Sequence, residues 1–142
     1  MNIDEFLELF KTGEESVTDH IKTHYVPYEK KADVAKAIID TCCWRTEKLP
    51  DGTEVKNFHV DSIGKHMLLC MSLIDLYTDI ERGKEEGKML EDFNKLNECG
   101  IFDIIISSLN KNEIKEYNMV IQMTYDDLIT NEYESHAFIS YL

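Results

Sequence analysis

Residues 62–80 read SIGKHMLLCMSLIDLYTDI and form the longest nearly unbroken apolar run of the chain. If this run is helical, apolar side chains fall on nearly every face, and a helix of that kind is one that other helices surround. Asp61 or Ser62 can cap its first turn, because a short side-chain oxygen accepts a hydrogen bond from the free amides there. Residues 62–80 are therefore expected to form the buried central helix of the protein.

Amphipathic helices are expected on both sides of this centre. Apolar residues recur at helical spacing in residues 3–12, 17–25, 28–43, 89–99 and 112–130. Pro27 suits the start of a helix, where a missing backbone N–H costs nothing. Gly100 suits a helix end, and Asn112 is a candidate cap for the last helix.

Two segments leave the type of element open. The β-branched run Ile104-Ile105-Ile106 within residues 101–109 suits either a buried strand or a short helix. The helix is favoured, because no second strong strand lies nearby to pair with it. Residues 45–48 and 53–57 flank the turn sequence Pro50-Asp51-Gly52 and predict either a small β-hairpin or a plain loop. The fold class is therefore mainly α, a compact bundle of five to six helices.

The length of 142 residues is that of one domain. We predict a single α-helical domain at residues 1–130 and a C-terminal extension at residues 131–142. This extension begins polar and ends with the sequence Ala137-Phe138-Ile139-Ser140-Tyr141-Leu142. A terminus this apolar is expected either to dock on its own domain or to contact a neighbouring molecule.

The composition is that of a folded protein with an unusually acidic balance. Hydrophobic residues make up 43% of the chain and charged residues 30%, while 28 acidic and 15 basic side chains give a net charge of −13. Such a surface repels phosphate backbones and anionic lipids, so direct binding to nucleic acid or to a membrane is not expected. The chain has no apolar run as long as a membrane span and no basic, signal-like start. We therefore expect a cytoplasmic protein whose partners are other proteins.

No catalytic, metal or cofactor site is predicted. The four cysteines lack metal-ligand spacing and are interpreted as small core residues. His20 and His24 stand four residues apart, as two metal ligands on a helix would, but a third ligand is not apparent. The chain has no nucleophile elbow and no phosphate-binding glycine loop. Paired acids such as Asp126-Asp127 are more simply explained as a solvated face, and the protein is expected not to be an enzyme.

The principal contact surface is expected in the C-terminal half. Residues after Met71 carry 15 acidic and 6 basic side chains, a net charge of −9. Charge would steer the encounter with a partner, and the apolar terminus would anchor it. The predicted partner-binding residues are Glu113, Glu116, Asp126, Asp127, Glu132, Glu134, Phe138, Ile139, Tyr141 and Leu142.

Several stretches together resemble a known group of proteins. These are Tyr25-Val26-Pro27-Tyr28-Glu29-Lys30-Lys31, Val60-Asp61-Ser62, the run from Leu73 to Glu81, Leu96-Asn97-Glu98-Cys99-Gly100-Ile101, and Asn131-Glu132-Tyr133-Glu134. From about Tyr25 to Leu142 the chain is similar to a family of small acidic proteins encoded among the virion genes of tailed bacteriophages of Firmicutes hosts. The preference for lysine over arginine, 13 to 2, agrees with an AT-rich genome of that kind.

This resemblance implies a non-enzymatic phage structural or assembly protein, such as a head-to-tail adaptor or neck component. Its expected partners are other virion subunits and further copies of itself. Its expected location is the host cytoplasm during assembly and then the virion. The alternative hypothesis is a phage-encoded acidic inhibitor of a host defence nuclease, an anti-CRISPR-like mimic of nucleic-acid charge. An enzyme with an unrecognised site is the weakest of the three hypotheses.

Overall fold

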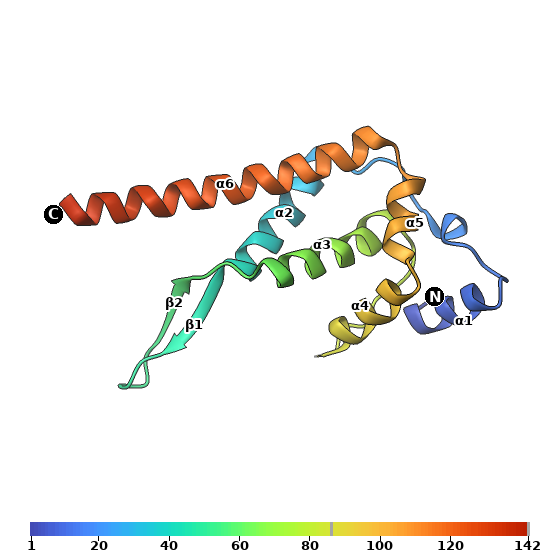
Figure 1. Ribbon diagram of the computed structural model, residues 1–142, viewed down its shortest axis with the longest axis horizontal. Helices are drawn as coiled ribbons and strands as arrows, with labels where there is room; N and C mark the ends of the chain where they lie inside the picture. Colours follow the sequence, from blue (N-terminus) through green and yellow to red (C-terminus); the bar gives the residue numbers. More distant parts are fainter. Residues whose placement is uncertain (86, 142) are drawn as a thin grey trace.

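The computed structural model describes residues 1–85 and 87–141, and the side chains of residues 132–141 lie outside this description. It is 65% helical, with six α-helices and one two-stranded antiparallel hairpin in the described residues. The prediction of a mainly-α fold of five to six helices is confirmed. Figure 1 shows helices α1, α4 and α5 gathered at one end, while the hairpin and the last half of α6 project from the other.

Helix α3, Ser62–Tyr77, lies at the centre as expected. The Asp61 carboxylate caps it by accepting a hydrogen bond of 2.9 Å from the Gly64 amide. The C-terminal half is buried, whereas Ile63 near the start is 78% exposed. Other helices thus surround only the second half of the predicted central helix.

The expected end of this helix at Ile80 is wrong by three residues. The helix ends at Tyr77, and Thr78 takes an extended conformation that forms an isolated antiparallel bridge with Ile21. The Lys22 amide donates to the Tyr77 carbonyl at 2.9 Å, and the Asp79 amide donates to the His20 carbonyl at 3.0 Å. These hydrogen bonds to a distant segment replace the ones that another helical turn would have made.

The N-terminal segment packs on this end of α3. Helix α1, Ile3–Lys11, begins with a capping box between Asn2 and Glu5 and buries Ile3, Phe6 and Leu7. The predicted short helix at residues 17–25 is only a 3₁₀ helix at Val17–His20. The chain then becomes extended at Ile21, because it pairs there with the segment after α3.

Helix α2, Tyr28–Cys42, starts directly after Pro27 as predicted. The hairpin of strands β1, Trp44–Lys48, and β2, Glu54–Phe58, joins it to α3. Of the two alternatives at this segment, the hairpin is the one observed, with Trp44 opposite Phe58. The turn depends on Gly52, whose φ of +89° is strained for any residue with a side chain.

The C-terminal half contains three consecutive helices. Helix α4, Lys88–Glu98, and helix α5, Ile101–Ser108, are separated by Gly100 in the left-handed conformation, with φ of +69°. Residues 101–108 are therefore helical, as favoured over a strand. Helix α6, Lys111–Tyr141, is 31 residues long. Asn110 rather than Asn112 caps it, because its side-chain oxygen accepts a 2.9 Å hydrogen bond from the Asn112 amide.

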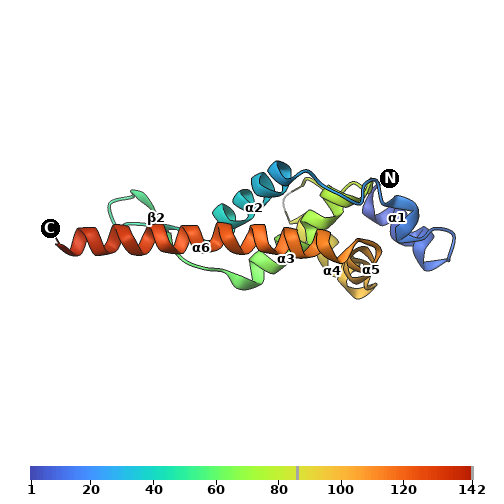
Figure 2. The same ribbon diagram turned by 90° about the horizontal axis from the view of Figure 1, so that it is seen from above.

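Helix α6 continues eleven residues beyond the predicted end at Thr130. The backbone of residues 131–141 is thus the end of a long helix that begins inside the domain. Two perpendicular views show this end extending past α2 and α3 on the side away from the N-terminus (Figures 1 and 2). The division between a domain at 1–130 and an extension at 131–142 stays a prediction.

Candidate interaction surface

The first half of α6 is held in place by α2 and α3. Near the start, the Tyr117 hydroxyl lies 2.6 Å from the Ser72 hydroxyl of α3. Further along, the Lys65 amine of α3 lies 4.5 Å from the centre of the Tyr125 ring. Leu128 shares a hollow with Ile39 of α2. Helix α2 ends at Cys42 and helix α3 begins at Ser62. The support that these two helices give to α6 therefore stops near Leu128.

A buried ionic cluster fixes the start of α6 against α2. Lys31 of α2 is fully buried and forms ion pairs with Glu113 and Glu116, the second at 2.9 Å. Glu113 is 4% exposed and also accepts a hydrogen bond of 3.3 Å from the Val26 amide. The ring of Tyr25 covers the amine, with 4.6 Å between the nitrogen and the ring centre.

This cluster corrects the sequence interpretation of Glu113. Its charge is buried and neutralised by Lys31, so it is part of the core and not of an exposed acidic surface. Glu116 is partly exposed but pairs with the same lysine. The field expected from the acids of α6 is weaker than the sequence suggested, because Lys31, 82 residues before Glu113, offsets one of the two negative charges of Glu113 and Glu116.

The electrostatics of the cluster favour its charged form. Burial alone would lower the pKa of Lys31, but hydrogen bonds to Glu113 and Glu116 outweigh burial and raise it. The nearby Tyr77 hydroxyl is buried, and burial together with the negative charge of Glu113 raises its pKa, so that it stays neutral. A buried lysine that pairs with two carboxylates links the two helices, and it keeps the Lys31 amine and the Glu113 carboxylate away from solvent, whereas Glu116 is partly exposed.

The other predicted contact residues divide into two groups. Asp126 and Asp127 are exposed on α6, and Asp126 accepts a hydrogen bond of 2.9 Å from the Gln122 side chain. The side chains of the remaining six lie outside the described residues, and their role stays a prediction; they are Glu132, Glu134, Phe138, Ile139, Tyr141 and Leu142.

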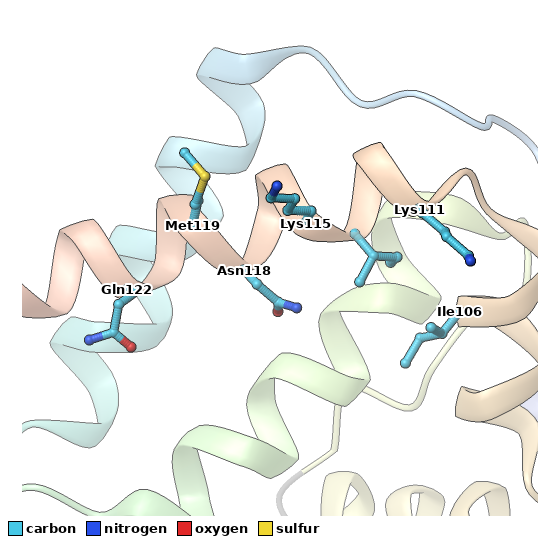
Figure 3. Close-up of a pocket in the computed structure, with 7 residues that line it drawn as sticks. Ile106, Lys111, Lys115, Asn118, Met119 and Gln122 are labelled. Carbon is cyan, nitrogen blue, oxygen red and sulfur yellow. The ribbon is translucent and has the colours of Figure 1, made fainter.

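A shallow groove follows α6 on the side where α5 meets it. We call this the α5–α6 groove; its lining residues are Ile106, Lys111, Ile114, Lys115, Asn118, Met119 and Gln122. Figure 3 shows these side chains along α6, with Ile106 on α5. Its volume is about 610 Å³, and among the described residues its lining contains two lysines and no acidic residue. Met119 is 52% exposed and Ile106 39%, so the apolar part of the groove is open to solvent.

Sequence reasoning missed the α5–α6 groove. A signal was present, because Lys111, Lys115, Met119 and Gln122 recur at the three- and four-residue spacing of one helix side. Our interpretation followed the more apolar side of α6, which includes Tyr117 and faces the core. The groove itself could not be recognised from the spacing in α6, because Ile106, which lines it as well, comes from α5.

His20 takes part in an ion-pair cluster with acids from two other segments. One ring nitrogen pairs with Glu15, and the other lies 2.8 Å from the Asp79 carboxylate. Burial opposes the positive charge, but these hydrogen bonds outweigh it and raise the pKa of His20. The ring also packs edge-on against Phe6, with 5.1 Å between ring centres. His24 is exposed and takes no part, so the two histidines do not act as a pair.

Three of the four cysteines lie in the core, as expected. Cys42, Cys43 and Cys70 are buried, and Cys99 is partly exposed. Burial raises the pKa of Cys42 to about 11, and it raises the pKa of Cys43 and of Cys70 as well. These three thiols therefore stay protonated near neutral pH and are poor nucleophiles.

Within the described part of the chain, no group of three or more histidine, cysteine, aspartate or glutamate side chains is arranged to hold a metal ion. In the same part, no helix has both the length and the apolar character needed to cross a bilayer. The chain matches no protein-family model, no curated protein sequence and no solved structure. The phage resemblance therefore stays a prediction based on the sequence.

Proposed function

We propose that this protein is a non-enzymatic structural or assembly protein of a tailed bacteriophage, such as a head-to-tail adaptor or neck component. It acts through contacts with other virion subunits and with further copies of itself. The resemblance in sequence supplies the phage context, and the shape of the molecule supports the mode of action.

One observation carries the mode of action, namely the length of α6. A helix of 31 residues is about 46 Å long, whereas a small domain is only about 30 Å across. The packed half of α6 ends where α2 and α3 end, and the remainder extends past them (Figure 1). The sequence of this remainder includes the apolar residues 137–142, and apolar side chains of this kind suit burial against a second protein surface.

The test is to find the protein in its assembled form. Particles and assembly intermediates of the phage that encodes it are purified and analysed by mass spectrometry. Tryptic peptides of this chain, at a fixed number of copies per particle, are the expected result. Absence of the chain from mature particles and from intermediates would contradict the proposal.

A capture experiment tests the alternative of a nuclease inhibitor. The full-length protein is immobilised, lysate of phage-infected host cells is passed over it, and the bound proteins are eluted with rising salt. Elution of a basic nuclease would favour the inhibitor, since the attraction between opposite charges weakens as salt screens it. Elution of other virion proteins from infected cells, with no nuclease, is the expected result.

A further inference from the structure

We propose that the α5–α6 groove of one copy binds the C-terminal segment, residues 132–142, of a second copy. This inference rests on the proposed function, because it identifies the surfaces through which copies of the chain assemble.

The groove cannot be filled by the C-terminal segment of its own chain. Its lining residues lie on α6 between Lys111 and Gln122, and the same helix continues without a break to Tyr141. The middle of the groove and the middle of the segment are twenty residues apart. At 1.5 Å per residue, about 30 Å of continuous helix separates them. An occupant from this sequence must therefore come from another molecule.

The charges of the two surfaces are complementary. Lys111 and Lys115 line the groove, and no acid does so in the part of the chain that the structure describes, although the whole chain has 28 acidic and only 15 basic residues. The C-terminal segment has Glu132 and Glu134 and neither lysine nor arginine. Attraction between opposite charges favours this pairing over a contact between two acidic surfaces.

The apolar content of the two surfaces is complementary as well. The groove presents Ile106, Ile114 and Met119, and the unbranched side chain of Met119 can adjust to the shape of a partner. The C-terminal segment contains Phe138 and Tyr141, and large aromatic side chains are the residues in which binding energy concentrates.

This contact joins two different surfaces, because the groove of one copy meets the end of the next. A dimer joined by one such contact keeps one free groove and one free segment, so that association continues beyond a dimer. Such a head-to-tail contact closes into a ring when the rotation between copies permits it, and otherwise forms a filament.

The experiment measures the mass of the full-length protein in solution by light scattering coupled to gel filtration. The wild type is expected to form species of several chains of 16.6 kDa each, and these species should dissociate as salt rises. The variant Lys111→Glu/Lys115→Glu should run as a single chain. The matched control Lys11→Glu/Lys56→Glu makes the same change of charge at two exposed lysines outside the groove and should still assemble. Circular dichroism and thermal unfolding confirm that each variant is folded.

Mixing two defective variants tests the pairing itself. One has the altered groove, and the other, Phe138→Asp/Tyr141→Asp, has an altered segment. Each alone should be monomeric, but their mixture should form a species of twice the chain mass, with one intact segment in one intact groove. A folded groove variant that still assembles, a mixture that stays monomeric, or a monomeric wild type would each overturn the inference. Detection of the chain in virions is a separate measurement, so failure of this inference is distinguishable from failure of the proposed function.

Discussion

Replacing Lys31 with methionine tests the buried ionic cluster between α2 and α6. Lys31 is fully buried and Glu113 is 4% exposed, so that the variant leaves a carboxylate inside the protein without its positive partner. Breaking a buried ion pair in this way costs about 3–5 kcal/mol. For a chain of this length such a loss lowers the melting temperature by about 10–17 °C. Urea unfolding followed by circular dichroism at pH 7 measures the change.

A second variant distinguishes the effect of the unpaired charge on stability from the effect of lost packing. Lys31→Met/Glu113→Gln removes both charges while retaining an acceptor for the Val26 amide. It should regain most of the lost stability, because a buried pair replaced as a unit costs little. A loss below about 1 kcal/mol in the single variant would refute the reasoning, because the cluster would then contribute no more than an exposed pair.

Three further predictions concern the core, the histidine and the C-terminus. Ile74→Ala should reduce the free energy of unfolding by about 2–5 kcal/mol through the cavity it leaves. Leu69→Ala should cost less, because Ile74 is fully buried and Leu69 only partly. Equal losses in urea titrations would contradict this. The pKa of His20 is raised, so its stabilising effect should be complete below the unfolded value of about 6.5 and lost as pH rises through the folded value. Thermal unfolding from pH 5 to 9 should show this slope in the wild type and lose it in His20→Gln, and a slope of opposite sign would count against the ion pairs. Deleting residues 137–142 should abolish assembly while leaving the urea midpoint nearly unchanged; an unfolded product would mean that these residues belong to the core.

The negative field predicted for the C-terminal half was based on a count of charged residues in the sequence, and tertiary contacts change the result. Fifteen acids after Met71, six of them within α6, pointed to a strong negative field in the C-terminal half. Tertiary packing brings Lys31 to the start of that helix, where its single positive charge pairs with Glu113 and Glu116 and offsets one of their two negative charges. Linear spacing gave no sign of this pairing, because Lys31 belongs to a different helix and looks like one of several solvated lysines.

The positions of most helices followed from local patterns. Apolar spacing, Pro27 before α2, Gly100 between α4 and α5, and the Asp61 cap of α3 act within one or two turns of chain, so they can be recognised without knowing the fold. The same local chemistry at Pro50-Asp51-Gly52 placed a turn there. It left open whether the flanking residues pair as strands.

Contacts between distant segments determined the rest. Helix α3 stops at Tyr77 because the next residues pair with the segment around Ile21, fifty-seven positions away from Thr78. Glu113 is internal because it meets Lys31, and the α5–α6 groove exists because Ile106 is placed beside Lys111 and Met119. Hydrophobic periodicity describes each helix by itself, whereas burial, ion pairing and grooves depend on which side of one helix meets another.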